Sequence, residues 1–271
     1  MKVQVFDLNG APNGEVALPV QFTEEVREDV IRRAFHAYAT IFFQPKGSDP
    51  RAGLRTTAEY YGRRHSWRQT INTGRSRLPR ERLAGGRLGR VLRVPHAVKG
   101  RRAHPPKPQK QILERINKKE KMMAIRSAIA AGLDKKLVTA RGHQLGKPLL
   151  TLQFPIVVDA SFETLKKTSE VEKTLKALGF DSDIQRADDR TKNPTGIRRL
   201  RGRGKRTPRS LLIVVSKDCP AVKASRNLAG LDVATVDKLN AVLLAPGGHL
   251  GRLMLWTKPA VQRMADEKLY L

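Results

Sequence analysis

Acidic, aromatic and cysteine residues are all scarce in this sequence of 271 residues. The 25 Asp and Glu face 53 Lys and Arg, so the formal net charge is +28 at pH 7. A compact chain with this imbalance repels itself, and such an excess is typical of proteins that bind a polyanion. The one cysteine, Cys219, excludes an internal disulfide framework and a multi-cysteine zinc site.

Long apolar segments are also missing. The longest uncharged run, around 239–251, has about a dozen residues, fewer than the roughly 20 that a membrane-spanning helix needs. The first ten residues, MKVQVFDLNG, lack the apolar stretch of a secretory signal. We therefore expect a cytoplasmic protein with no membrane partner.

The positive charge is concentrated in two tracts. Residues 43–110 hold 18 basic against three acidic side chains, and residues 186–209 hold ten against two. Together the tracts carry +23 of the net charge of +28, whereas residues 1–42 have a net charge of −2. The sequence predicts one globular domain made of residues 1–42 and 111–271, an extended basic loop at 43–110, and a second basic segment at 186–209 within the globular part.

The globular part alternates between strand and helix patterns. Short β-branched apolar runs at 154–158 and 211–215 are typical of buried parallel strands. Thr23 can cap a helix with Glu24 and Glu25 in its first turn. The alternation predicts an α/β fold: a mostly parallel sheet flanked by helices in three layers, with a Rossmann-like topology and a long irregular basic loop inserted near the N-terminus. We expect strands at 2–8, 154–158, 211–215, 231–235 and 253–256, and helices at 24–42, 109–131, 169–178, 239–244 and 258–269.

The tract at 43–110 has the composition of a nucleic-acid-binding loop. It contains eight glycines, no sustained periodicity and little apolar surface, so we expect it to order on RNA; a disordered basic linker is the alternative. Arg outnumbers Lys by 14 to four, and guanidinium groups offer forked donors to phosphate and a flat face to bases. Tyr61 and Trp67 lie among these arginines, where they can stack on unpaired bases.

The second basic segment has seven cations in the twelve residues 198–209. A solvated surface loop and a localisation signal are its alternative readings. The predicted RNA-binding residues of both tracts are Tyr61, Arg63, Arg64, Trp67, Arg68, Arg75, Arg77, Arg80, Arg82, Arg87, Arg90, Arg93, His96, Lys99, Arg101, Arg102, His104, Lys107, Arg198, Arg199, Arg201, Arg203, Lys205, Arg206 and Arg209.

Patterns for catalysis or metal binding are weak. The stretch 142–147 is one residue short of a P-loop, and two other glycine-rich stretches lack the spacing of nucleotide loops. The six histidines have no ligand spacing with each other or with Cys219. Asp188 and Asp189 adjoin Arg186 and Arg190, which favours local charge compensation over a metal site. We expect neither enzymatic activity nor a metal site, cofactor or small-molecule substrate.

Five motifs then follow one another along nearly the whole chain: 93–107 (RVPHAVKGRRAHPPK), 125–131 (IRSAIAA), 140–143 (ARGH), 227–235 (NLAGLDVAT), and 244–248 (LAPGG) with 251–253 (GRL). Jointly they resemble the universal large-subunit ribosomal protein four, in its archaeal and eukaryotic branch. The stretch 74–80 looks like the tunnel-facing part of that family's long loop.

The resemblance implies a structural constituent of the large ribosomal subunit. In this family an α/β body lies on the subunit surface and supports assembly, and an extended loop penetrates the 23S-type rRNA. That loop helps to line the peptide exit tunnel opposite ribosomal protein twenty-two, and 198–209 matches a second rRNA-contacting segment. The implied partners are rRNA, with its associated Mg²⁺ ions, and neighbouring ribosomal proteins.

Two other functions fit the charge alone. A methyltransferase-like enzyme that modifies nucleic acid would need a glycine-rich cofactor loop after the first strand, where this chain has only the turn-like stretch 8–14. A general nucleic-acid-packaging protein would bind duplex DNA and folded rRNA equally well. The family motifs disfavour both.

Overall fold

The chain divides into two units. The computed structural model describes residues 1–65 and 69–271. The first unit consists of Met1–Phe42 and Leu113–Leu271, and the second of Phe43–Ile112. Among the described residues, no helix is both long enough and apolar enough to cross a membrane.

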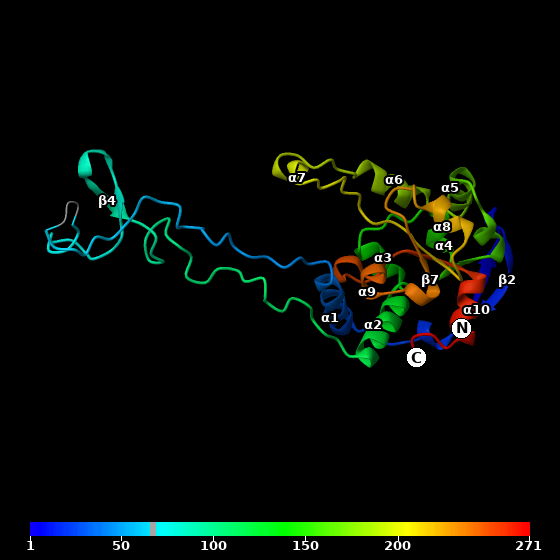
Figure 1. The fold of residues 1–271 in the computed structure, drawn as a ribbon. Coiled ribbons are helices and arrows are strands. Elements are labelled where there is room, and N and C mark those ends of the chain that lie inside the picture. The colour runs from blue at the N-terminus through cyan, green and yellow to red at the C-terminus, as the bar shows by residue number, and fades with distance from the viewer. Residues whose placement is uncertain (66–68) are drawn as a thin grey trace. The chain divides into compact units, whose positions relative to one another are not determined.

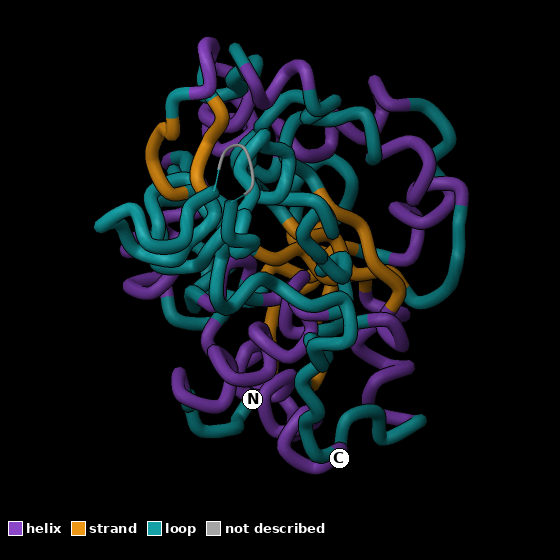
Figure 2. The backbone as a smooth tube through the Cα atoms, turned by 60° about the vertical axis from the view of Figure 1, so that its left-hand side comes forward, coloured by secondary structure: helices purple, strands orange, loops and turns teal. Residues whose placement is uncertain are grey.

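A six-stranded sheet forms the centre of the first unit (Figures 1 and 2). Its order is β2-β1-β5-β8-β6-β7, and every neighbouring pair is parallel except β1 with β2. The strands are β1 (Lys2–Phe6), β2 (Pro12–Ala17), β5 (Ile156–Val158), β6 (Leu212–Val215), β7 (Asp232–Thr235) and β8 (Met254–Thr257). The predicted α/β fold with a mostly parallel sheet is confirmed.

The Rossmann-like part of the prediction is not confirmed. Dinucleotide-binding sheets place their first strand in the middle, whereas here β8, the last strand of the chain, pairs with both β5 and β6. Strand β2 is missing from the prediction because only Val16 of its six residues is buried. It therefore shows no apolar alternation, and its pairing with β1 holds it in place.

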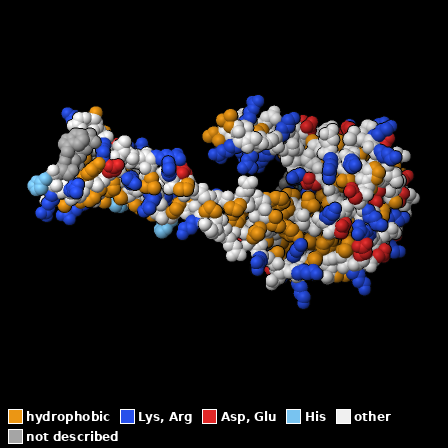
Figure 3. Space-filling view, in the orientation of Figure 1, with side chains coloured by type: hydrophobic (Ala, Val, Ile, Leu, Met, Phe, Trp, Pro, Cys, Tyr) orange, Lys and Arg blue, Asp and Glu red, His pale blue; other side chains and the backbone are white. Residues whose placement is uncertain are grey.

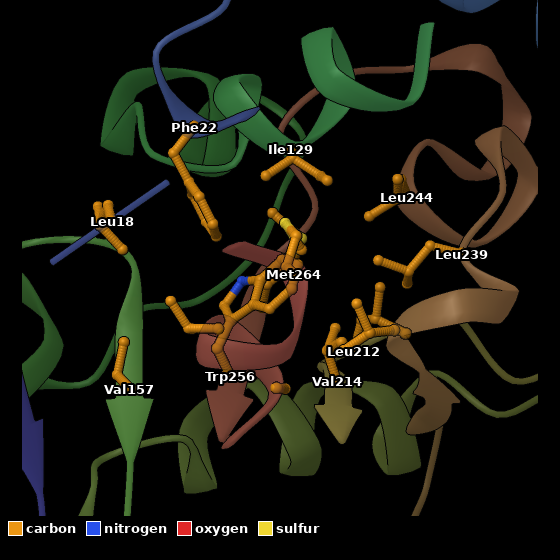
Figure 4. Close-up of a cluster of buried hydrophobic side chains, with 14 of the residues drawn as sticks. Leu18, Phe22, Ile129, Val157, Leu212, Val214, Leu239, Leu244, Trp256 and Met264 are labelled. Carbon is orange, nitrogen blue, oxygen red and sulfur yellow. The ribbon is translucent and has the colours of Figure 1, made fainter. Parts of the chain in front are cut away.

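Each face of the sheet has its own apolar core. On β6, Leu212 belongs to one cluster of buried side chains and its neighbour Ile213 to the other. Trp256 on β8 is fully buried in the first cluster, where Phe22 meets its ring edge-on with the ring centres 5.0 Å apart (Figure 4). Because helices supply the other half of both cores, the unit has three layers.

Most of the helices contribute buried side chains to one of the two cores. The first core uses α2 (Lys118–Ala131) and α10 (Lys258–Asp266), and the second uses α5 (Thr168–Ala177) and α8 (Pro220–Ser225). Helix α1 (Glu28–Thr40) packs against α2. The remaining helices are α3 (Lys135–Ala140), α4 (Lys147–Thr151), α6 (Asp181–Asp189), α7 (Ile197–Leu200) and α9 (Ala241–Leu244).

Helix α1 begins later than predicted. Thr23 does not cap it; instead Thr23 ends a short 3₁₀ turn, η1 (Val20–Phe22). The chain then turns, and the backbone N–H of Arg27 donates to Ser127 Oγ at 2.6 Å before the helix starts at Glu28. The helix start is therefore set by a contact with α2, 100 residues away in sequence.

Helix α2 is also shorter than predicted, although its end at Gly132 is confirmed. Residues 109–117 are not helical. In this stretch the N–H of Glu114 donates to Thr40 Oγ1 at 3.2 Å, and Ile116 packs against a small cluster between α1 and α2. Ile116 therefore reaches this cluster without being part of a helix.

The second unit contains a β-hairpin where the sequence predicts only irregular structure. Strand β3 (Arg80–Arg82) pairs antiparallel with β4 (Leu88–Val91) around the turn η2 (Ala84–Gly86). Elsewhere in this unit the outgoing and returning segments approach closely. A Cβ added at Gly53 would lie 2.7 Å from the backbone of Arg101, so only glycine fits there.

The second basic segment forms an arm of the first unit. After α6 the chain runs out to α7 and then returns (Figure 1). The backbones of Lys192 and Arg206 pair across the base of the arm, with N–O distances of 3.0 and 2.9 Å.

Candidate nucleic-acid interface

A small nucleus holds the hairpin of the second unit in place. The backbones of Glu59 and Arg80 exchange two hydrogen bonds of 3.2 Å. Ala58 and Leu92 are buried, and the guanidinium of Arg93 donates to the carbonyl of Ala58 at 3.3 Å. This part of the loop is therefore held by its own hydrogen bonds and buried side chains. The low apolar content of residues 43–110 gave no indication of such contacts.

Tyr61 and Arg82 are engaged with each other. The Arg82 guanidinium lies 4.6 Å from the centre of the Tyr61 ring and donates to the Tyr61 hydroxyl and to Glu59. One face of the Tyr61 ring is therefore already covered by a cation. A base could stack only on the other face, and Arg82 is tied to the hairpin rather than free for phosphate.

The other predicted cations of the loop are mostly exposed. Its three acidic residues each pair with one arginine: Asp49 with Arg55, Glu59 with Arg82, and Glu81 with Arg90. Three carboxylates leave most of the positive charge uncompensated (Figure 3). Exposed predicted residues are Arg63, Arg64, Arg75, Arg77, Arg87, Arg90, Arg93, His96, Lys99, Arg101, Arg102, His104 and Lys107, while Arg80 is half-buried; Trp67 and Arg68 lie outside the described residues.

The arm presents its cations in the same way. Arg198, Arg199, Arg201, Arg203, Lys205 and Arg206 are all exposed. The arm also exposes two apolar residues of α7, Ile197 and Leu200. Ile197 is 66% exposed and Leu200 is 87% exposed, so a partner could cover both.

Arg209 is exposed as well, but unlike the cations of the arm it forms a salt bridge with the body. Its guanidinium donates to Asp232 Oδ1 at 2.6 Å. The other oxygen of Asp232 accepts from Arg252 at 2.6 Å, and Arg252 is almost completely buried. Two guanidinium groups therefore share one carboxylate, so Asp232 compensates the buried charge of Arg252 only in part.

Arg186 pairs with Asp183 rather than with its neighbours Asp188 and Asp189. Its Nε donates to Asp183 Oδ1 at 2.8 Å, while Asp183 Oδ2 lies 3.0 Å from Nδ1 of the buried His143. Among the described residues, no salt bridge joins Asp188 or Asp189 to Arg186 or Arg190, so the predicted local compensation is not seen. Helix geometry accounts for Asp188, which lies two positions from Arg186, but not for Asp189, which is three positions away, as Asp183 is.

His143 is held as a neutral ring. Its Nε2 accepts from the N–H of Leu253 at 3.4 Å, so Nδ1 carries the proton that it donates to Asp183. Burial lowers the pKa of His143, and the hydrogen bond to Asp183 opposes this only in part. Burial raises the pKa of Asp183, but the hydrogen bonds from His143 and Arg186 outweigh it and bring that pKa below its usual value.

Arg141 was not predicted as a functional residue. Its guanidinium donates to the carbonyls of Pro246, at 2.8 Å, and of His249. Burial, together with the nearby cations Arg252 and Arg186, lowers the pKa of Arg141 to about 10. Arg141 and Arg252 both fall in the sequence motifs 140–143 and 251–253, which were the only signal that could have found them.

The described residues contain no group of three or more His, Cys, Asp or Glu side chains arranged to hold a metal ion. The fold and the charge distribution define a class: an α/β body with two cationic extensions that expose many arginine side chains. The chain belongs to the ribosomal protein L4/L1 family, whose sequence model matches residues 16–267. This confirms the resemblance seen in the motifs and the prediction that the chain is not an enzyme.

Individual relatives match over their whole length. The chain is 46% identical over 267 residues to the large ribosomal subunit protein uL4 of Methanococcus vannielii, covering 98% of this chain and 99% of the relative. It is 46% identical to uL4 of Methanocaldococcus jannaschii, with 98% and 99% covered, and 42% identical to uL4 of Methanothrix thermoacetophila, with 99% and 100% covered.

Proposed function

We propose that this chain is a structural constituent of the large ribosomal subunit, in which its two basic segments bind 23S-type rRNA. The exposed and largely uncompensated cations of the loop and the arm carry the proposal. Each of these cations that neutralises a phosphate releases condensed counterions, which favours binding. Contacts go mainly to phosphates, sugars and unpaired bases, because the major groove of A-form RNA is too narrow to read.

The loop at 43–110 penetrates the rRNA, supports assembly and helps to line the peptide exit tunnel near a protein of the twenty-two family. Two observations support this. The loop returns alongside itself, as the contact of Gly53 with Arg101 requires, and it ends in a hairpin with its own nucleus. Each half of this loop, about 30 residues long, can reach up to roughly 100 Å when fully extended. Any Mg²⁺ at this interface belongs to the RNA, and the protein acts in the cytoplasm as part of the ribosome.

The test is replacement of 43–110 by a short Gly-Ser linker. The shortened protein is expected to keep a folded body with cooperative unfolding, since the body has its own cores. Its incorporation into large subunits should fall by roughly tenfold or more, because most phosphate contacts are lost. Sedimentation followed by quantitative mass spectrometry of the 50S-type fraction measures this.

A second variant keeps the length of the loop and changes its exposed arginines to glutamine. It should show the same loss of incorporation. Normal incorporation of both variants would overturn the proposal. Family membership argues against the methyltransferase-like and packaging functions, and neither is retained.

A further inference from the structure

The body contains an open cleft of about 650 Å³ at the base of the arm. It brings together segments that are far apart in sequence: the end of α3, the residues before β6, and the turn after α9. Three arginines line it, namely Arg141, Arg186 and Arg209, together with His143 and His249. The two sequence motifs around 140–143 and 244–251 thus meet at one place.

The charges around this cleft do not balance. Four guanidinium groups lie in and behind it, and the carboxylates within salt-bridge distance of them are Asp183 and Asp232. Asp183 pairs with Arg186, and Asp232 pairs with both Arg209 and Arg252. Glu28, the one acidic residue that lines the cleft, pairs with Arg32 on its own helix.

Arg141 is the cation left without a carboxylate among the described residues. Its guanidinium is satisfied only by backbone carbonyls, those of Pro246, His249 and Leu250. A partly buried guanidinium without a counter-anion is unfavourable, and the two nearby cations that depress its pKa add to this cost. An anion placed in the cleft would relieve it.

We infer that this cleft binds a phosphodiester of rRNA, as a third contact besides the loop and the arm. The inference rests on the proposed function. RNA is favoured as the source of the anion because Pro208 and Arg209 line the cleft and directly follow the exposed cations of the arm. A strand that follows the arm toward the body would therefore reach Arg141. A carboxylate from an acidic segment of a neighbouring protein is the competing occupant.

The first variant places a negative charge in the cleft without removing a packed side chain. Ala140 lines the cleft and is exposed, so Ala140→Glu keeps the core intact. It should pair with Arg141, leaving thermal stability equal or higher, and should weaken binding of the full chain to 23S-type rRNA by about tenfold, the loss of one charge-assisted contact. The matched control is Thr139→Glu, the adjacent exposed position on α3 that does not line the cleft; its affinity should stay close to that of the unmodified chain.

The second variant is Arg141→Gln, with Arg126→Gln as its control. Arg126 is also a partly buried arginine that donates to a backbone carbonyl, but it has a carboxylate partner, Glu24. Arg141→Gln should lower rRNA affinity and make the slope of log affinity against log salt shallower by about one. Arg126→Gln should change stability and leave that slope unaltered.

A cross-link identifies the occupant. Ala140→Cys in a Cys219→Ser chain, labelled with an aryl azide and assembled into large subunits, should cross-link to rRNA. Cross-linking to protein alone, or equal rRNA affinities for Ala140→Glu and Thr139→Glu, would overturn the inference while leaving the proposed function standing. Loss of rRNA binding by the unmodified chain would instead overturn the proposed function.

Discussion

The pair of His143 and Asp183 links the stability of the body to pH. Both side chains are buried and hydrogen-bonded to each other at 3.0 Å. Burial lowers the pKa of His143 in the folded state, so below about pH 6.5, where a free histidine takes up a proton, the unfolded chain binds more protons than the folded one. The contribution of the neutral His143 to the free energy of unfolding is therefore fully present above pH 6.5. It falls as the pH is lowered toward the pKa of His143 in the folded state.

We expect the free energy of unfolding, from urea titrations, to decrease between pH 7 and pH 5. A second decrease should begin near pH 4, because the pKa of Asp183 also lies below its usual value in the folded state. His143→Gln can still donate to Asp183 but cannot titrate, so it should flatten the first decrease and leave the second. An equal slope between pH 7 and pH 5 in both proteins would contradict this assignment.

The start of α1 depends on one hydroxyl of α2. Ser127 is fully buried; its Oγ accepts from the N–H of Arg27 at 2.6 Å and donates to the carbonyl of Glu25 at 2.8 Å. Ser127→Ala leaves both backbone groups without this partner and should cost about 1–3 kcal/mol. Thr139→Ala removes an exposed hydroxyl that bonds only to its own helix and should change stability by less than about 0.5 kcal/mol. Chemical denaturation compares the two.

This contact also explains which elements the sequence could predict. The strands β5, β6 and β8 and the helix α5 show strong local patterns, and all were predicted to within two residues. The start of α1 was not, because a local pattern around Thr23 resembles a cap and the deciding partner, Ser127, is 100 residues away. The site divides in the same way: composition revealed the exposed arginines, whereas the pairing of His143 with Asp183 exists only in the folded chain.

The order of the strands depends on the whole chain. No local pattern could show that β8 lies between β5 and β6, since this pairing is set by packing of the complete sheet. The near-neutral body and the cationic extensions likewise have separate roles in the molecule. The body can fold by burying apolar surface, and the extensions add charge without taking part in that core.

The central position of β8 makes the end of the chain essential to the fold. Deleting 251–271 removes β8 and α10, and with them Trp256, Val261 and Met264 from the first core. It would separate β5 from β6 and expose the edges of both, so we expect the shortened chain to lose cooperative unfolding completely. Replacement of 43–110 serves as the control, because it removes 68 residues, more than three times as many, and none of them belongs to the sheet of the body. Thermal unfolding followed by near-UV circular dichroism should show a sharp transition for the loop variant and none for the truncated one. A cooperative transition in the chain that ends at Leu250 would show that β5 and β6 can hold the sheet together without β8.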